Sequence, residues 1–329
     1  MLNIGIVGAS GYVGQELNRI LSKHPDVCVG SLSARRARPA LGIKKFNIKK
    51  IVSSCDLVFF ALPHAESMKF VPLVLRAKKK VIDLGADYRL KNTGEFTTWY
   101  AIKHSDKNNV VSSVYGLPAV YAKQIKKASL VANPGCYPTA AILSLLPLIK
   151  KKIIDTNSII IDAKSGFSGA GRKNVEDGLL DELKENFKPY KVNYHQHMPE
   201  INQELSKYSG KRISVNFVPH LLPVFRGLMT TTYVKIVKAK SNISDAKLTE
   251  LYKKFYKNDP FLRIRSQNSS VQIKDVVETN FCDIAIYLRK ESKMIVVVSV
   301  IDNLVKGAAG QAVENMNLMY GFKQTEGLL

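Results

Sequence analysis

Short apolar runs alternate with helix-like segments over the first 135 residues. Runs rich in Ile, Val and Phe at 2–8, 27–33, 55–63 and 80–84 predict buried strands. Apolar residues recur at helical spacing after the first run, and further helices are predicted at 66–79, interrupted by Pro72, and at 121–128. The segment 110–118 suggests a strand or extended chain. This alternation predicts an α/β fold, a Rossmann-type parallel sheet whose loops bind ligands at the carboxyl ends of the strands.

The pattern changes after about residue 155. Closely spaced apolar segments predict strands at 158–166, 212–223, 228–238, 271–278, 281–290 and 294–301. Few helices are expected there, at 201–208 and 244–258, which indicates an α+β domain on a largely antiparallel sheet. The segment 306–322 has helical spacing and is expected to pack back on the first domain. We therefore expect a dinucleotide-binding domain over 1–137, completed by a C-terminal helix within 304–329, and a substrate and oligomerisation domain over 138–303.

The chain has 329 residues and a formal net charge of +22, which raises the alternative of a nucleic-acid-binding protein. Its lysines, however, lie in short scattered groups, and neither a basic tail nor a zinc-finger pattern is present. We therefore expect no nucleic-acid partner, and a general positive field that attracts anionic ligands. No apolar run approaches the ~20 residues that span a membrane. The absence of a secretory segment and of CxxC or zinc-type spacings favours a cytoplasmic protein without a metal; Cys28, Cys55 and Cys282 are expected in the core.

A glycine turn follows the first predicted strand. Its sequence GASGYVG places Gly8, Gly11 and Gly14 where a dinucleotide-binding turn needs close backbone approach to a pyrophosphate at a helix N-terminus. The residues expected to bind the cofactor here are Gly8, Ser10, Gly11, Tyr12, Val13 and Gly14. The second strand ends without the acidic residue that holds an NAD ribose, and instead with Ser33, Arg35 and Arg36. Hydroxyl and guanidinium groups suit a 2′-phosphate, so NADP(H) is the predicted cofactor; the alternative is that both arginines lie in a solvated loop.

The heptapeptide NPGCYPT sets Cys136 on a turn just ahead of a predicted helix. Pro134 and Gly135 favour the turn, and Pro138 suits the first helical turn because its missing N–H is not needed there. A helix N-terminus favours a thiolate over a thiol. Cys136 is therefore the predicted nucleophile, and the alternative is a small residue buried in a tight turn.

A cysteine nucleophile needs an acid or base, and HQHMPEI supplies His195 and His197. Spacing alone does not rank the two; His197 is the first choice and His195 the second. Two further segments, SGFSGAGR and VPHLLPVFRG, supply groups that suit a phosphate or carboxylate: Ser165, Ser168, Arg172, His220 and Arg226. His24 and His104 are expected at the surface.

At this point the chain resembles a known family. The segments GASGYVG, ALPH, GADYR, NPGCYPT, KSGFSGAGR, HQHMPEI, FVPHLLPVFRG and DNLVKGAAGQA, which run from residue 5 to residue 312, are similar to N-acetyl-gamma-glutamyl-phosphate reductases of arginine biosynthesis, within the wider aspartate-semialdehyde dehydrogenase group. One departure is Ala65, where the family commonly has glycine after ALPH.

The resemblance implies an NADPH-dependent acyl-phosphate reductase. The Cys136 thiolate would form a thioester with N-acetyl-L-glutamyl 5-phosphate, and hydride reduction would release N-acetyl-L-glutamate 5-semialdehyde. Asn303, Lys306 and Gly307 would border the nicotinamide, and the protein would be a homodimer or homotetramer. A relative that acts on an aminoadipyl phosphate remains an alternative, because one methylene is worth only about 1–3 kcal/mol of discrimination.

Overall fold

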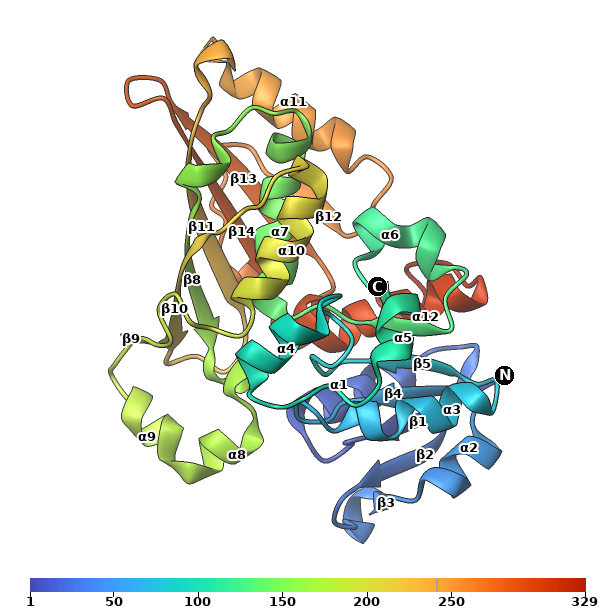
Figure 1. Cartoon of the computed structure of the whole chain (residues 1–329). Coiled ribbons are helices and arrows are strands. Elements are labelled where there is room, and N and C mark those ends of the chain that lie inside the picture. The colour runs from blue at the N-terminus through green and yellow to red at the C-terminus, as the bar shows by residue number, and fades with distance from the viewer. Residues whose placement is uncertain (241) are drawn as a thin grey trace. The chain divides into compact units, whose positions relative to one another are not determined.

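A computed structural model describes residues 1–240 and 242–329 (Figure 1). The chain forms two compact units. The first contains Met1–Gly135 and Ala308–Leu329, and the second contains Cys136–Gly307. The chain therefore passes from the first unit to the second at Gly135 and returns at Gly307, beside two of the motifs expected to form the active site.

The first unit holds a seven-stranded sheet in the order β3-β2-β1-β4-β5-β7-β6, and all its pairings are parallel. Its central strands are buried and apolar because helices need a hydrophobic surface on both faces of a parallel sheet. The predicted α/β class is thereby confirmed. The strands are β1 Leu2–Val7, β2 Val27–Ala34, β3 Lys44–Lys45, β4 Leu57–Phe60, β5 Lys80–Asp83, β6 Val114–Tyr115 and β7 Leu130–Ala132.

Seven α-helices accompany this sheet among the described residues: α1 Tyr12–Leu21, α2 Ile48–Ser54, α3 Val71–Arg76, α4 Thr93–Tyr100, α5 Lys107–Ser112, α6 Pro118–Ile125 and α12 Gly310–Tyr320. The C-terminal helix α12 packs against α1, α6 and β5. The Lys80 ammonium donates to the carbonyl of Met319 at 2.8 Å, and the imidazole of His24 lies 3.0 Å from the Asn317 side chain. These bonds tie the end of the chain to the first sheet.

The second unit holds a seven-stranded sheet in the order β12-β13-β14-β11-β8-β10-β9. Pairs β8/β10 and β12/β13 are parallel and the other pairs are antiparallel, so the expectation of a largely antiparallel sheet is confirmed. Its strands are β8 Ile160–Gly166, β9 Lys188–Pro189, β10 Asn216–Leu222, β11 Leu228–Lys235, β12 Leu262–Ile264, β13 Cys282–Arg289 and β14 Met294–Ile301.

Helix α7 (Cys136–Lys150) packs on β11 and β14, and nearly every residue after Cys136 is buried. Pro147 removes an N–H from this helix, which leaves the carbonyl of Leu143 without its usual partner. The hydroxyl of Tyr256 donates to that carbonyl at 2.7 Å, and the hydroxyl of Tyr252 donates to the next one, on Ser144. A proline in a buried helix is therefore tolerated because two tyrosines, from α11 (Asp245–Phe255) and its C-terminal cap, supply donors.

Several local expectations differ from the structure. Residues 271–278 form a short 3-10 turn at Ile273–Asp275 and not a strand, since Ile273 packs against Gly227 and Val276 is fully buried within an irregular loop. Residues 110–112 end α5, and only Val114–Tyr115 are extended. The helix expected at 66–79 is divided into a 3-10 turn at Ser67–Lys69 and α3, and Pro72 is the second residue of α3 and lies within its first turn. Cys28 is exposed, whereas His24 and His104 are buried and bonded.

Candidate active site

Cys136 is the first residue of α7 and is partly exposed. The other cysteines differ from it. Cys55 and Cys282 are buried, and burial raises the pKa of both thiols, that of Cys282 to about 12. Cys28 is exposed but lies in strand β2. Among the four, Cys136 alone combines partial exposure with a place at the N-terminus of a 15-residue helix, whose dipole favours negative charge there.

Gly307 closes one side of the Cys136 position. A Cβ added at Gly307 would lie 2.7 Å from the Cβ of Cys136, a distance that real Cβ atoms essentially never show, and 3.2 Å from its Cα, which is a tight contact. The Gly307 N–H donates to the carbonyl of Asp302 at 2.9 Å, which fixes this stretch of backbone. The glycine of the VKGAAGQA motif is therefore explained by close approach to the cysteine.

The two predicted histidines lie together in an aromatic cluster beside Tyr137. The ring of His195 is 4.8 Å from that of His197, 5.6 Å from Tyr137, 5.4 Å from Tyr190 and 5.6 Å from Phe217. The His197 ring is 5.9 Å from Tyr137. His195 is 8% exposed and its Nδ1 accepts the main-chain N–H of His197 at 3.1 Å, whereas His197 caps helix α10 (Met198–Ser209) and is more accessible.

Tyr137 and Tyr190 line the same cluster and were not predicted. The Tyr190 hydroxyl donates to that of Tyr137 at 3.4 Å, and Tyr137 donates to the His220 carbonyl at 3.1 Å. Burial, foremost, raises the pKa of both phenols well above the ordinary value, so both remain neutral hydrogen-bonding groups. The sequence did carry a signal for Tyr137, because it follows the cysteine in NPGCYPT.

His220 lies on β10 opposite Lys164 of the neighbouring strand β8, and its side chain reaches Asp162 on the same strand. Its Nδ1 is 3.3 Å from the Asp162 carboxylate and 3.1 Å from the Ala163 carbonyl, and the Phe187 ring stacks on it at 5.2 Å. The structure therefore adds Asp162 as a partner that sequence spacing did not reveal.

The remaining predicted substrate groups occupy two loops. The Ser165 hydroxyl donates to the Gly166 carbonyl at 3.1 Å, and Ser168 accepts from the Asn303 amide at 2.9 Å. Arg172 begins the short helix α8 (Arg172–Asn174), and the Arg226 guanidinium is 3.5 Å from the Asp302 carboxylate.

Two of the residues expected beside the nicotinamide are engaged inside the second unit. The Asn303 side chain accepts the Gly227 N–H at 2.8 Å in addition to its bond to Ser168. Lys306 is fully buried, and its ammonium lies 5.2 Å from the centre of the Phe261 ring. Both contacts give these residues a packing role within the unit.

The glycine turn of the first unit has the geometry of a dinucleotide cradle. Gly8 has φ +91°, and a Cβ there would lie 2.1 Å from the Ala61 carbonyl oxygen. A Cβ at Gly14 would lie 2.3 Å from the Gly8 oxygen, so this glycine lets α1 approach the strand. Gly11 caps α1; its N–H donates to the Gly8 carbonyl at 3.1 Å, and a Cβ added there would have only the Gly8 oxygen within 4 Å, at 3.6 Å.

The residues expected near a 2′-phosphate are distributed around the end of β2. Arg35 and Arg36 are exposed directly after the strand. Ser33 is 2% exposed, and its hydroxyl donates to the Ile6 carbonyl at 3.3 Å. Two exposed guanidinium groups therefore accompany a serine that contributes mainly to the strand itself. No carboxylate stands in the stretch from Ser31 to Arg36.

Among the described residues, no group of three or more His, Cys, Asp or Glu side chains is placed to hold a metal ion. The same residues include no helix with the length and apolar character that crossing a bilayer requires.

Two family models match the chain: "Semialdehyde dehydrogenase, NAD binding domain" over residues 3–128 and "Semialdehyde dehydrogenase, dimerisation domain" over 136–303. Solved structures agree in fold. Aspartate semialdehyde dehydrogenase II from Vibrio cholerae, complexed with ASA, has a TM-score of 0.73 at 18% identity and covers 98% of both chains. Aspartate semialdehyde dehydrogenase with NADP from Candida albicans has a TM-score of 0.69 at 15% identity, covering 97% of this chain and 98% of that one. The protein is thus an oxidoreductase of the semialdehyde dehydrogenase class with a domain for a nicotinamide dinucleotide.

Curated relatives define the family within that class. The N-acetyl-gamma-glutamyl-phosphate reductase of Pelotomaculum thermopropionicum is 43% identical over 99% of this chain and 97% of its own length. That of Geobacter metallireducens is 43% identical over 100% of this chain and 98% of its own. The chain belongs to the N-acetyl-gamma-glutamyl-phosphate reductase family, as the motifs indicated.

Proposed function

We propose that this protein reduces N-acetyl-L-glutamyl 5-phosphate to N-acetyl-L-glutamate 5-semialdehyde and phosphate with NADPH, as a step of arginine biosynthesis in the cytoplasm. The observation that carries the proposal is Cys136 at the first residue of α7, walled by Gly307, in a chain 43% identical over its whole length to reductases of that name. All four cysteines are free, as a reducing compartment requires.

Cys136 acts as the nucleophile. Its Sγ attacks the acyl carbon, a C–S bond forms, and the bond from that carbon to the phosphate oxygen breaks, so that phosphate leaves and a thioester remains. NADPH, when bound, supplies the hydride that reduces this thioester to a thiohemiacetal. The C–S bond then breaks, the aldehyde forms, and the sulfur leaves as a thiolate.

His197 is the proposed acid and base. It gives a proton to the thiohemiacetal oxygen as it forms and removes that proton when the C–S bond breaks. His195 suits this role less well, because its Nδ1 already accepts the His197 N–H and its ring is enclosed by Tyr137, Tyr190 and Phe217. We assign His195 to holding His197 at the start of α10.

Arg172, His220 and Arg226, with Ser165 and Ser168, are proposed to bind the phosphate or carboxylate groups of the substrate. The Asp162 carboxylate lies 3.3 Å from Nδ1 of His220 in this group of residues. The turn from Gly8 to Gly14 would hold the pyrophosphate of the cofactor, and Arg35 and Arg36 its 2′-phosphate. This last assignment makes NADP(H), and not NAD(H), the proposed cofactor.

The reverse reaction tests the function. Purified protein is mixed with N-acetylglutamate semialdehyde, inorganic phosphate and NADP, and NADPH is followed by absorbance. NAD and the semialdehyde one methylene longer are run in parallel. We expect phosphate-dependent turnover with NADP and the shorter aldehyde. Turnover confined to the longer aldehyde would assign the chain to the aminoadipyl reaction.

Substitution of the nucleophile tests the covalent step. Cys136→Ser should lose nearly all turnover, because a serine hydroxyl is a much weaker nucleophile than a thiolate. The variant should keep its affinity for NADPH. Retention of activity within about tenfold of wild type would contradict a thioester mechanism, because removing an essential nucleophile costs far more than tenfold.

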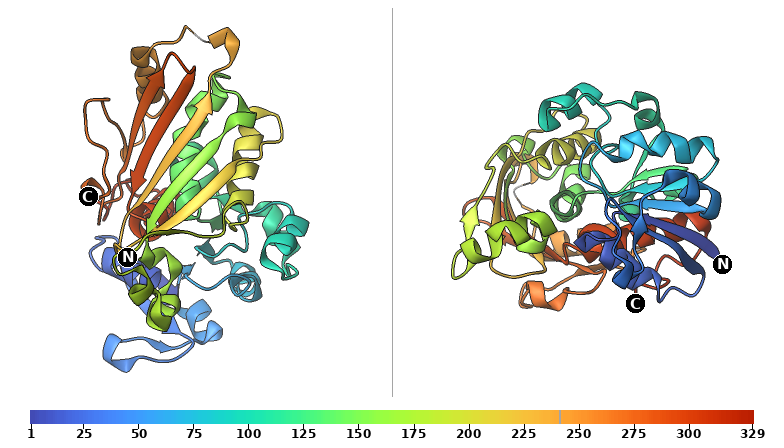
Figure 2. Two further views of the ribbon diagram at one scale, coloured as in Figure 1. Left: turned by 90° about the vertical axis from the view of Figure 1, so that its left-hand side faces the viewer. Right: turned by 90° about the horizontal axis from the view of Figure 1, so that it is seen from below.

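We also propose a dimer formed by the second sheet, because the matching family model is a dimerisation domain. Helices α7 and α10 lie on one face of this sheet (Figure 2). On the other face Met229, Thr231 and Tyr233 of β11 and Val296 and Val298 of β14 are partly exposed. A second copy of the chain would bury these residues.

The self-association is tested by sedimentation of Val298→Glu. A charge at the centre of the interface should give monomers, whereas the control Val111→Glu, at a site 82% exposed on α5, should sediment as wild type. If Val298→Glu remains an oligomer, this face is not the interface.

A further inference from the structure

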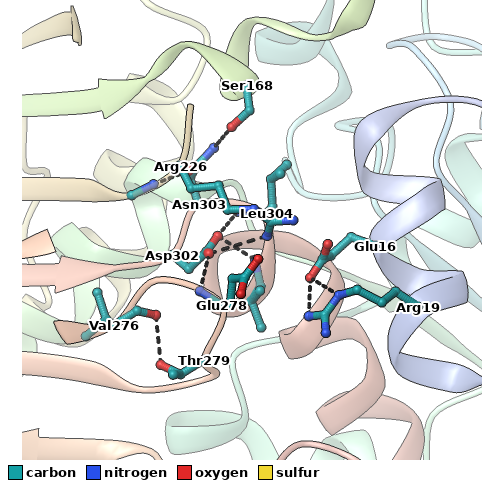
Figure 3. Close-up of polar contacts among 12 residues, drawn as sticks. Glu16, Arg19, Ser168, Arg226, Val276, Glu278, Thr279, Asp302, Asn303 and Leu304 are labelled. Atoms are coloured by element: carbon teal, nitrogen blue, oxygen red, sulfur yellow. Dashed lines mark hydrogen bonds and ion pairs between the residues drawn. The ribbon is translucent and has the colours of Figure 1, made fainter. Parts of the chain in front are cut away.

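Asp302 connects several predicted site loops of the second unit and has had no role so far. It follows β14 and is completely buried (Figure 3). One carboxylate oxygen accepts the N–H groups of Leu304 at 2.7 Å and Val305 at 3.1 Å. The other accepts the N–H of Glu278 at 2.7 Å and faces the Arg226 guanidinium at 3.5 Å. A buried carboxylate with this many donors is fully paired, so its geometry is fixed.

The main chain of Asp302 reaches the cysteine. Its carbonyl accepts the N–H of Gly307 at 2.9 Å, and Gly307 is the residue whose Cα lies against Cys136. The backbone between these two residues is held at both ends, by the carboxylate at Leu304 and Val305 and by the carbonyl at Gly307. Asp302 therefore holds in place the backbone segment that lies beside Cys136.

Asn303 extends the same arrangement to two further loops. Its carboxamide accepts the N–H of Gly227, the residue after Arg226, at 2.8 Å and donates to the Ser168 hydroxyl at 2.9 Å. Gly227 has φ +101° and could carry no side chain, since a Cβ would meet Ile273 at 1.8 Å. The position of Arg226 is thus set by Asp302 through its guanidinium and by Asn303 through the adjacent backbone (Figure 3).

We infer that Asp302 is a positioning residue that orients the Arg226 guanidinium toward an oxyanion of the substrate and holds the Gly307 backbone against Cys136. The inference rests on the proposed function for the identity of the substrate. The oxyanion is either the phosphate or the carboxylate of the substrate, two groups that a guanidinium binds by the same bidentate chemistry.

The test uses Asp302→Asn, Arg226→Lys and the double variant in the phosphate-dependent reverse reaction. Asparagine keeps the shape of the side chain but removes the charge, and its amide would place a donor opposite other donors. We expect each single variant to raise the KM of phosphate or of the semialdehyde at least tenfold, and the double variant to be no worse than the poorer single one. A rise in the KM of phosphate would indicate that Arg226 binds the phosphate, and a rise in the KM of the semialdehyde would indicate that it binds the carboxylate.

Asp283→Asn is the matched control. Asp283 is also a buried carboxylate of the second unit that pairs with arginines, Arg263 and Arg265. It should lower the midpoint of thermal unfolding without changing either KM. Loss of stability alone would then be separated from loss of positioning.

A second measurement does not depend on turnover. Cys136 is alkylated with iodoacetamide with and without inorganic phosphate, and the modified peptide is quantified by mass spectrometry. Phosphate should protect wild type but not Asp302→Asn, if Arg226 holds phosphate. An inactive wild type would contradict the proposed function, whereas phosphate protection of that wild type and its loss in Asp302→Asn would still support the role of Asp302.

Three results would overturn the inference. The first is that Asp302→Asn leaves both KM values and the phosphate protection within twofold of wild type. The second is a double variant whose effect equals the product of the two single effects, which would show that the residues act independently. The third applies if Asp302→Asn does not fold: Arg226→Lys must then raise one KM by itself, and an unchanged Arg226→Lys rejects the proposal.

Discussion

Gly307→Ala is the substitution whose effect the structure determines most directly. The added methyl group would lie 2.7 Å from the Cβ of Cys136 and 3.3 Å from the Asp302 carbonyl oxygen. Carbon atoms pack at about 3.5–4.0 Å, so the two backbones must separate by about 1 Å. Overpacking of this kind costs about 1–3 kcal/mol of stability, which a folded protein of this size tolerates.

The larger effect is expected on catalysis. A displacement of about 1 Å of a reacting group costs on the order of 100-fold in rate. We therefore expect kcat of Gly307→Ala in the reverse reaction to fall about 100-fold, and the rate at which iodoacetamide alkylates Cys136 to change with it. NADPH affinity, measured by fluorescence titration, should change much less.

Gly30→Ala is the matched control, because Gly30 has an ordinary φ and no heavy atom within 4 Å of an added Cβ. It introduces the same methyl group and should leave kcat and alkylation unchanged. A Gly307→Ala protein with kcat within threefold of wild type and normal alkylation would show that contact with Gly307 does not position the cysteine.

Three further substitutions test the reasoning elsewhere. Ala65 has φ +64°, so Ala65→Gly should relieve about 1 kcal/mol of strain and raise the midpoint of thermal unfolding by about 2–4 °C, whereas Ala122→Gly within α6 should lower it. His197→Gln should lower kcat about 100-fold or more with Cys136 alkylation retained, and His195→Gln should affect stability more than kcat; the opposite ranking would reverse their roles. Burial and then the neighbouring Asp87 carboxylate raise the pKa of Asp83 to about 8. Between about pH 4 and 8 the Asp83 carboxyl is therefore protonated in the folded state and ionised in the unfolded state. The free energy of unfolding, measured with urea, should fall over this range by up to about 1.4 kcal/mol per pH unit. Asp83→Asn should remove this slope.

The longer strands of both sheets were predictable because local pattern and final structure agree, whereas the short strands β3, β9 and β12 were not predicted. Strands β13 and β14 read as apolar runs and form as such, and the first strand, its glycine turn and α1 follow one another as expected. Residues 271–278 have a similar apolar pattern but do not form a strand. The side chain of Ile273 fills the space left by Gly227, and Glu278 adopts φ +62° and donates its N–H to the Asp302 carboxylate. Those partners are distant in sequence, and no local period encodes them. His24 was misjudged for the same reason, because it packs with Asn317 from the far end of the chain.

The sequence indicated the candidate site residues as a set of motifs, but it did not indicate their contacts. The glycine and prolines around Cys136 predicted a turn followed by a helix, and in the structure Cys136 is the first residue of helix α7. Two histidines two residues apart did not reveal which is enclosed; the answer comes from Tyr190 and Phe217, which pack on His195 from other elements. Nor could the sequence show that Asn303 and Lys306 make contacts inside the second unit, since their neighbours Ser168 and Phe261 lie far away in the chain.

The position of Cys136 follows from how the chain leaves and re-enters the first unit. Within that unit, Asn133 donates to the carbonyl of Ala308 at 3.1 Å, which joins the outgoing and returning segments. Within the second unit, Gly307 lies against Cys136. The outgoing segment is also held by Arg89, which donates to the Asn133 carbonyl at 2.8 Å. A reactive residue on a long loop would move with that loop. Cys136 instead begins a buried helix and has the backbone of Gly307 against it. The fold thus fixes the cysteine by the path of the main chain, and the proposal leaves the proton transfer to His197 and the binding of a substrate oxyanion to Arg226.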